Sequence, residues 1–490
     1  MAALSPAAAA APSERAAVLV VPPTSPVFAS AAAAHGLLVP GEGASVTRRG
    51  ALASLLRGKL ENSLVGGVPS GKRLISLSSS PAETTFYVAL PPRGSHHNVV
   101  RYPIAVVGPG YRGILTSRAT RLDGLVSIAD VAPSVRALER GERPGIRARP
   151  ASDPIARLAR LDRRLDRSHD TRVAAMVVLS SLMTALGLMT LATRRTPLGR
   201  AAFLAAPACI TVAVLLSALG ATTRWVVIVA LSLASAALAL AGGALLRPRL
   251  PLAAALAAFF AFLFAVMWTE PGWNTLAVIG PHPDGGGRFY GVTNQVETLL
   301  LSPALVLGAV VGVRALPAVA LFVAAGIGAS RVGADGGGLV VFLTGLLVLG
   351  IRLCRLPARR AAAATVVAAA AALALVGIDA ATGGSSHVTH AVGGGPGSLL
   401  GDLGHRLHLS ASSIASAWNA AFLFSISLVG LVWLALRRPR RAVLDALLAA
   451  LAVSLVVNDT PADVAGWGAL SALVLWAWLE RTEERSPPLE

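Results

Sequence analysis

The run Val173–Ala192, VAAMVVLSSLMTALGLMTLA, decides the fold class of this chain. It carries no charged side chain, and its length matches the ~20 residues that an α-helix needs to cross the hydrocarbon core of a bilayer. The whole sequence of 490 residues is 54% hydrophobic, with a mean hydropathy of +0.66. Ordinary soluble domains are less apolar than this. The composition therefore predicts a polytopic α-helical membrane protein.

Similar apolar runs follow the first one to the end of the chain, separated by short polar breaks. We count about eleven predicted transmembrane helices. They begin near Val173, Ala201, Trp225, Pro251, Val296, Leu316, Leu339, Ala361, Trp418, Ala442 and Val464. The run over 316–330 is the shortest. These runs define a transmembrane domain over residues 173–480, followed by a tail over residues 481–490.

The placement of arginine predicts the orientation. The formal net charge is +18, but the basic residues lie mainly in short loops between apolar runs, so we predict membrane lipids and no nucleic acid as partners. One set of alternate loops, with the tail, contains Arg194, Arg195, Arg200, Arg247, Arg249, Arg314, Arg352, Arg355, Arg359, Arg360, Arg437, Arg438, Arg440, Arg441, Arg481 and Arg485. The opposite side contains Arg224, Arg288, Arg331 and Arg406. Because short basic loops stay in the cytoplasm, this ratio of about four to one places the C-terminus inside and the N-terminal region outside.

Two short segments flank the predicted extracytoplasmic domain. Residues 1–12, MAALSPAAAAAP, look like the cleavage region of a signal peptide, and we expect the translation start to lie upstream. Residues 151–172 precede the first apolar run and carry Ile155, Leu158, Leu161 and Leu165 at helical spacing. Because arginines accompany this apolar stripe, we predict an amphipathic helix at the membrane surface.

Residues 13–150 differ in kind from the rest of the chain. The runs AAVLVVPP, RLISLSS, TTFYVALPP and YPIAVVGPG each indicate a buried strand followed by a turn. Helix-like pieces such as RGALASLLRGKL lie between them. This order of elements predicts an α/β domain.

The stretch Tyr102–Gly141, YPIAVVGPGYRGILTSRATRLDGLVSIADVAPSVRALERG, resembles the closing portion of the alkaline-phosphatase-like superfamily. In such enzymes a segment of the type DIAPT opens the last helix, and here the corresponding residues are Asp130, Val131, Ala132, Pro133 and Ser134. The resemblance covers the rest of the domain only loosely. It implies a shortened fold of this type, in a bacterial membrane protein of actinobacterial type. Asp130 before a proline in the first turn also fits a helix cap.

The resemblance does not bring the chemistry of that superfamily with it. Members that transfer phosphoryl groups hold two metal ions with carboxylates and histidines. Where the first strand would end in a metal-binding aspartate, this chain has Pro22 and Pro23. His97 is a single histidine in a polar loop, and the only cysteines are Cys209 and Cys354. We therefore predict no cofactor, no metal site and no phosphatase activity in this domain.

Polar residues gather in the loops of the membrane region that are predicted to face outside. The stretch Gly285–Leu300, GGGRFYGVTNQVETLL, precedes an apolar run, ASRVGADGGG precedes another, and VVNDTPADVAG joins the last two. The candidate substrate-binding residues are Arg288, Tyr290, Asn294, Glu297, Arg331, Asp335, Asn458 and Asp459. We expect Glu297 to pair with Arg288 or Arg331, because a carboxylate at that depth is costly alone. The alternative is that the aromatics and arginines anchor the chain and the carboxylates satisfy helix ends.

Three functions fit these features. The first is a cell-envelope protein that binds, and transfers, an anionic lipid-linked or glycopolymer substrate at the external face. The second is a proton-coupled transporter or flippase in which Glu297 and Asp335 carry protons. The third is an assembly or sensor scaffold whose N-terminal domain binds an envelope protein. The sequence does not decide whether the chain is an enzyme.

Overall fold

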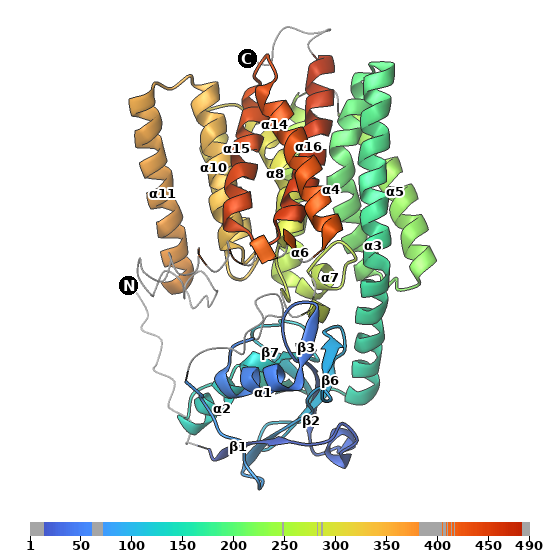
Figure 1. The fold of residues 1–490 in the computed structure, drawn as a ribbon, viewed down its shortest axis with the longest axis vertical. Helices are drawn as coiled ribbons and strands as arrows, with labels where there is room; N and C mark the ends of the chain where they lie inside the picture. Colours follow the sequence, from blue (N-terminus) through green and yellow to red (C-terminus); the bar gives the residue numbers. More distant parts are fainter. Residues whose placement is uncertain are drawn as a thin grey trace. The chain divides into compact units, whose positions relative to one another are not determined.

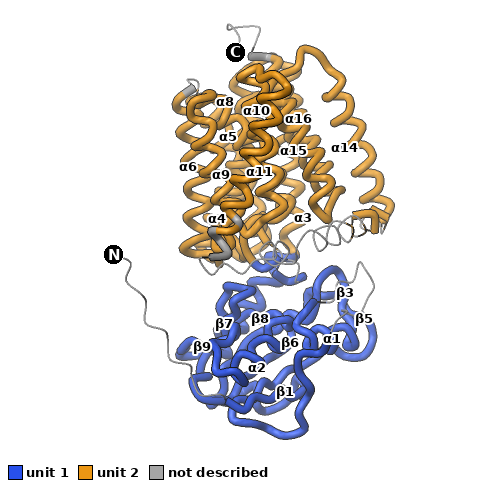
Figure 2. Tube along the Cα trace, turned by 90° about the vertical axis from the view of Figure 1, so that its left-hand side faces the viewer, with its two compact units in different colours: residues 1–169, 282–289 blue, residues 170–281, 290–490 orange. Residues whose placement is uncertain are grey.

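The computed structural model describes residues 14–60, 72–246, 249–281, 283–285, 288–381, 404, 408, 410–412, 414–415 and 417–482. In these residues the protein is mostly helical, with many apolar helices and an N-terminal α/β domain (Figure 1). The chain divides into two compact units, coloured separately in Figure 2. Unit 1, the α/β unit, comprises Met1–His169 and His282–Phe289, and unit 2, the helical unit, comprises Asp170–Pro281 and Tyr290–Glu490.

A mixed seven-stranded sheet forms the α/β unit. Its order is β1 (Ala16–Val20), β4 (Thr84–Val88), β6 (Tyr102–Val107), β2 (Ala34–Val39), β7 (Gly113–Ser117) and β9 (Ile146–Arg149), and β8 (Leu125–Ser127) also pairs with β2. β1 runs parallel to β4, whereas β4 with β6, β6 with β2, and β7 with β9 are antiparallel. The short strands β3 (Ser45–Thr47) and β5 (Ser95–His97) form a separate two-stranded antiparallel sheet.

Helices α1 (Arg48–Arg57) and α2 (Val131–Glu139) complete the core of this unit. Their buried side chains join those of the sheet in one hydrophobic cluster that includes Leu55, Phe86 and Ile128. The predicted strands over AAVLVVPP, TTFYVALPP and YPIAVVGPG are confirmed as β1, β4 and β6, and the predicted helix after Arg48 is α1.

The predicted strand over RLISLSS, residues 73–79, was wrong. The backbone of this segment makes isolated hydrogen bonds instead of a ladder: Leu74 N–H donates to the Leu56 carbonyl, and Ser78 N–H donates to the Val18 carbonyl. The apolar residues Leu74 and Ile75 pack beside α1, so their hydrophobicity reflects burial against a helix rather than strand pairing.

Helix α3 (Pro154–Thr193) joins the predicted amphipathic helix and the first apolar run in one continuous helix. In its first half, Leu158 and Leu165 are buried, while Ile155 is exposed. Residues up to His169 belong to the α/β unit. The apolar stripe that we assigned to a membrane surface is therefore used for packing in the α/β unit.

Each of the other ten predicted apolar runs also lies in a helix: α4 (Thr196–Ala218), α5 (Arg224–Leu245), α6 (Arg249–Thr269), α8 (Asn294–Val311), α9 (Leu316–Gly328), α10 (Gly336–Leu353), α11 (Ala358–Ala381), α14 (Trp418–Leu436), α15 (Ala442–Val457) and α16 (Pro461–Thr482). Within the described ranges, nine helices, including α3, are long and apolar enough to cross a membrane. α9 and α15 are shorter. A short helix, α7 (Pro271–Thr275), was not predicted.

The core of the helical unit lies among α4, α8, α10, α15 and α16, where Leu299, Leu300, Phe342 and Leu475 are fully or almost fully buried. Other helices present large apolar side chains outward, such as Leu233 on α5, Val366 on α11 and Phe422 on α14. This arrangement leaves several apolar helix faces without a protein partner inside the described unit.

Candidate functional site: a buried carboxylate at the start of helix α8

Helix α8 begins as its sequence predicts. Thr293 has extended backbone and its hydroxyl accepts a hydrogen bond from Val296 N–H at 3.2 Å, which is the usual geometry of a helix N-cap. The helix therefore starts at Asn294, and Asn294 and Glu297 both lie in its first turns, three residues apart. The stretch of polar residues in front of this apolar helix thus contributes an amide and a carboxylate to its N-terminal end.

Glu297 is fully buried inside the helical unit, with 0% of its surface exposed. Asn458 Nδ2 donates to its Oε2 at 2.9 Å, and Ser454 Oγ donates to its Oε1 at 3.3 Å. Asn458 Nδ2 also donates to Ser454 Oγ at 2.8 Å. Ser454 lies in the last turn of α15 and Asn458 follows that helix as its C-cap, so the spacing of four residues places both on one face. These three residues form a polar triad.

A second pair of contacts joins α8 to the connection between α15 and α16. Asn294 Nδ2 donates to Asp459 Oδ1 at 2.7 Å and to Thr460 Oγ1 at 3.1 Å. The Asn458 carbonyl accepts a hydrogen bond from Ser410 Oγ at 3.0 Å. Two residues from one helix start therefore meet three consecutive residues that lie far away in the sequence.

Asp335 caps α10 on the border of this cluster. Its Oδ1 accepts a hydrogen bond from Gly338 N–H at 3.0 Å, and only 2% of the residue is exposed. A Cβ at Gly337 would lie 3.0 Å from Asn458 Oδ1 and 3.6 Å from Asp335 Oδ1, which places this glycine between the two side chains. The interpretation of Asp335 as a group that satisfies a helix end is therefore confirmed.

Glycines allow the two turns that carry these groups to touch through their backbones. Val292 N–H donates to the Gly333 carbonyl at 2.9 Å, and Gly333 N–H donates to the Gly326 carbonyl at 2.9 Å. Gly291 has a φ of 83°, and a Cβ there would lie 2.1 Å from the Gly333 oxygen. Only glycine fits this approach, as the sequence RFYG followed by a glycine-rich turn suggested.

The remaining predicted site residues are Arg331, Arg288 and Tyr290. Arg331, one of the two expected partners of Glu297, is exposed, and its guanidinium lies over the Trp268 ring at 5.9 Å from the centroid. A cation above an indole face is stabilised by the ring quadrupole, which explains this position. Arg288 belongs to the α/β unit. Tyr290 is half-buried in the helical unit.

Sequence reasoning missed Ser454, Thr460 and Ser410. A signal for the first two was present, because Ser454 and Asn458 share the spacing i, i+4 on an apolar helix and Thr460 follows directly. A polar stripe on one face of a helix that is otherwise apolar indicates a polar partner. The partner's identity required the fold, because Glu297 lies 157 residues away from Ser454.

In the α/β unit, Asp130 precedes α2 at the predicted position but does not cap it through its side chain. Its carboxylate instead accepts hydrogen bonds from Ser117 Oγ and from Ala119 N–H. Burial raises the pKa of Asp130 to about 6, against the opposing effect of these two hydrogen bonds. Asp130 has a helical ψ, so its side chain points away from the free N–H groups of α2. The described residues contain no cluster of three or more His, Cys, Asp or Glu arranged to hold a metal ion.

Of the predicted residues, the structure thus brings together Asn294, Glu297, Asp335, Asn458 and Asp459. Three of these are acidic and none is basic, and the carboxylate at the centre accepts hydrogen bonds from a neutral amide and a neutral hydroxyl. Comparisons with protein-family models, with curated proteins and with solved structures found no match to this chain.

Proposed function

We propose that this chain is an integral membrane protein of the bacterial cell envelope, with its α/β unit on the extracytoplasmic side and its C-terminus in the cytoplasm. Support comes from the nine long apolar helices and from the outward apolar faces of α5, α11 and α14. The arginine-rich ends of the helices alternate as expected for a chain that crosses a membrane repeatedly. α9 and α15 would complete eleven crossings.

This topology determines on which side of the membrane the polar cluster lies. The starts of α8, α10 and α16 and the end of α15 all fall on the extracytoplasmic side, because consecutive spans alternate in direction. Glu297, Asp335, Asn458 and Asp459 occupy these ends. The triad would therefore lie just within the outer part of the bilayer, reachable from outside after a small local rearrangement.

The function that this geometry supports best is proton-coupled transport, with Glu297 as the proton carrier. The observation that carries the proposal is the complete burial of Glu297 among apolar helices, with Asn458 and Ser454 as hydrogen-bond donors. An ionisable group within a membrane segment is expensive and is by default a candidate for proton relay or ion movement. Asn458 and Ser454 would position the carboxylate in both protonation states, because an amide N–H and a hydroxyl donate to an ionised or a neutral oxygen alike.

A carbodiimide tests the proton-carrying role before any substrate is known. Dicyclohexylcarbodiimide attacks carboxyl groups that are protonated in apolar surroundings, and the adduct is located by peptide mass spectrometry. We expect labelling of Glu297 in the full-length protein, and none at this position in Glu297→Gln. Asp445, which pairs with Arg352 at 3.0 Å near the other end of the helices, is the matched carboxylate that should resist the reagent.

A flux assay then separates transport from a structural role. In proteoliposomes that enclose a pH-sensitive dye, an imposed membrane potential should drive proton movement through the wild-type protein in the presence of cell-envelope extract as a substrate source. Glu297→Gln should abolish it, and Asp445→Asn should not. Equal flux in all three proteins would remove Glu297 from the mechanism.

A second candidate function is the binding of an anionic lipid-linked substrate at the external face. It is favoured by the exposed Arg331, stacked on the exposed Trp268, since a guanidinium beside an aromatic anchor suits a phosphate at the level of lipid headgroups. Lipids that copurify with the protein would be identified by mass spectrometry. We expect Arg331→Ala to lose part of the bound anionic lipid, and Arg224→Ala to lose a comparable part, because Arg224 lies over Trp225 in an equivalent stack at 5.7 Å.

A further inference from the structure

Two indole rings surround one guanidinium where α14 and α16 end. Arg437 follows α14 as its C-cap, and Trp433 lies one turn before it on the same face. On α16, Trp476 and Glu480 repeat this spacing. Figure 1 shows α14 and α16 next to each other, and both belong to the helical unit. Two neighbouring helix ends therefore supply one group of four side chains.

The rings and the guanidinium lie close together. The Arg437 Cζ atom lies 4.4 Å from the centroid of the Trp433 ring and 4.8 Å from that of the Trp476 ring. The two centroids lie 5.3 Å apart, with 78° between the ring planes. We call Trp433, Trp476 and Arg437 the arginine cage. Since each ring quadrupole attracts the cation, two rings fix its position more firmly than one ring does in the stacks of Arg331 and Arg224.

The caged guanidinium has N–H groups that no protein group uses. Its Nη1 lies 3.6 Å from Glu480 Oε2, which is an ion pair but too long for a hydrogen bond. Within the part of the chain that the structure describes, no oxygen accepts a hydrogen bond from this side chain. The Arg437 side chain is 42% exposed. The cage thus holds a cation in place and leaves its donors open to a ligand.

The loop that follows α14 is strongly basic. Its sequence, RRPRR over Arg437–Arg441, contains four arginines. Arg352 at the end of α10 joins them, because its Nη2 donates to the Arg440 carbonyl at 3.4 Å. The carboxylates of Asp445, which pairs with Arg352 at 3.0 Å, and of Glu480 balance only part of this charge. This end of the helical unit therefore attracts an anion.

An exposed apolar stripe leads along α14 to the cage. Phe422, Ile426, Val429, Trp433 and Leu436 are between 42% and 75% exposed, and their spacing of three and four residues places them on one face. The stripe is ~21 Å long at 1.5 Å per residue, which exceeds the ~15 Å of hydrocarbon in one leaflet. It can therefore accommodate the length of an acyl chain.

We propose that the arginine cage binds the phosphate of an anionic glycerophospholipid, with an acyl chain along the apolar stripe of α14. Arg437 donates to two phosphate oxygens, a geometry that suits its planar fork. The basic loop selects a headgroup with net negative charge, and Trp433 contacts both the headgroup region and the chain. A phosphate with an attached acyl chain matches the cage and the stripe together, whereas free phosphate matches the cage alone.

This site is separate from the functions proposed above. Asn458 and Arg441 flank opposite ends of α15, so the cage and the Glu297 triad lie at opposite ends of the helices. Under the proposed topology the cage faces the cytoplasmic leaflet. Tryptophan and arginine also anchor helix ends at a membrane interface. An anchor does not select among lipids of different charge, so lipid selectivity distinguishes the two roles.

Native mass spectrometry of the full-length protein in an uncharged detergent measures the affinity for added phosphatidylglycerol. Arg437→Ala removes the caged cation, and Arg437→Lys keeps the charge without the planar fork. Arg359→Ala is the control, because Arg359 is an exposed arginine at the start of α11, on the same predicted side of the membrane. Phosphatidylcholine and inorganic phosphate are the competing ligands.

We expect Arg437→Ala to weaken binding of the first phosphatidylglycerol about tenfold or more, as the loss of charge-assisted hydrogen bonds implies. Arg437→Lys should lose most of the same affinity, and Arg359→Ala should bind as the wild type does. Phosphatidylcholine should bind the wild type about tenfold more weakly or less. Excess inorganic phosphate should leave the lipid bound, because it has no chain to cover the stripe.

A photoactivatable phosphatidylglycerol with a diazirine on its acyl chain tests the wild type alone, so this result does not depend on how a variant folds. In nanodiscs, the adducts found by peptide mass spectrometry should concentrate between Phe422 and Leu436. Adducts spread evenly over the outward faces of α5, α11 and α14 would overturn the proposal. Equal affinity in Arg437→Ala and Arg359→Ala, equal binding of the two lipids, or displacement of the lipid by phosphate would overturn it as well.

Discussion

Replacement of Asn458 by alanine should destabilise the helical unit, and replacement of both Asn458 and Glu297 by apolar residues should not. Asn458 Nδ2 makes hydrogen bonds of 2.9 Å to Glu297 and 2.8 Å to Ser454, and both acceptors are 0% exposed. A hydrogen bond to a charged group contributes about 1.5–3 kcal/mol, and a neutral one about 1 kcal/mol. The loss is limited, because measured hydrogen bonds between membrane helices average only about 0.6 kcal/mol. We therefore expect Asn458→Ala to cost about 2 kcal/mol.

The double variant tests whether the loss of stability in Asn458→Ala comes from the polar partner that is left behind. In Glu297→Met with Asn458→Leu, both members of the pair become apolar, and the Ser454 hydroxyl that loses them can hydrogen-bond to the backbone of its own helix, so the cost should fall below about 1 kcal/mol. Proton flux should nevertheless be lost. The four proteins of this double-mutant cycle are compared by reversible unfolding in mixed micelles with increasing sodium dodecyl sulfate. Additive losses in the double variant would show that the triad contributes no coupled energy, and the account of Glu297 as the centre of a polar network would fail.

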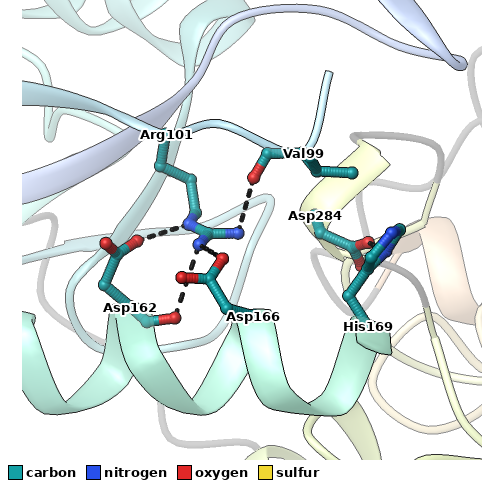
Figure 3. A network of polar contacts seen from close by, with 6 residues as sticks. All are labelled: Val99, Arg101, Asp162, Asp166, His169 and Asp284. Atoms are coloured by element: carbon teal, nitrogen blue, oxygen red, sulfur yellow. Dashed lines mark hydrogen bonds and ion pairs between the residues drawn. The ribbon is translucent and has the colours of Figure 1, made fainter. Parts of the chain in front are cut away.

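The remaining predictions concern backbone fit, pH and ion pairing. Gly291→Ala should cost about 1–3 kcal/mol more than Gly312→Ala in the same unfolding assay. Both glycines have φ near 80°, but only a Cβ at Gly291 would meet another atom, the Gly333 oxygen at 2.1 Å, so equal losses would refute the close contact. Because the pKa of Asp130 is raised, the folded α/β unit binds the Asp130 proton more tightly than the unfolded chain does. The stability of the unit should therefore be greatest below pH 3.8 and decline, by at most about 3 kcal/mol, as the pH rises to about 6. Asp130→Asn should flatten this slope in hydrogen exchange corrected for intrinsic rates, and an unchanged slope would reject the assignment. Arg101→Gln removes a buried guanidinium that holds Asp162 and Asp166 (Figure 3), so it should increase exchange in the first half of α3. Arg140→Gln, which breaks an exposed pair with Glu142, should leave it unchanged.

The helical part of the fold was predictable because each apolar helix is specified locally. A run such as Val173–Ala192 contains its own signal of length and hydrophobicity, and every predicted run lies in a helix. The same local logic found α1, with Thr47 as its N-cap and Gly58, at a φ of 65°, as its C-cap. It failed at Leu74 and Ile75, because a short apolar run has the same composition in a strand and in a segment packed on a helix.

The candidate site was only partly predictable, because residues that meet in it lie far apart in the sequence. Asn294 and Glu297 could be assigned to a helix start from the sequence around Thr293. Their partners Asn458 and Asp459 could be identified as polar residues at a helix end, but not as contacts. Arg331 was chosen as a partner on charge alone, and its stacking on Trp268 depends on where two loops meet. The contacts of Asp284 and Gly285 with His169 and Asn98 in the α/β unit were not foreseen, since nothing in the residues around Asp284 indicates the sheet unit that binds them.

The most direct test of the central claim, that the chain spans a membrane with its α/β unit outside and the Glu297 site at the outer helix ends, uses the protein's own cysteines. Cys354 is free and exposed at the arginine-rich end of α10, while Cys209 is buried and should be silent. Ser79→Cys adds an exposed thiol to the α/β unit. With a membrane-impermeant maleimide on intact spheroplasts, the account predicts labelling of the introduced cysteine alone, and of Cys354 only after permeabilisation. Labelling of Cys354 in intact spheroplasts would contradict it, whether or not the introduced cysteine reacts.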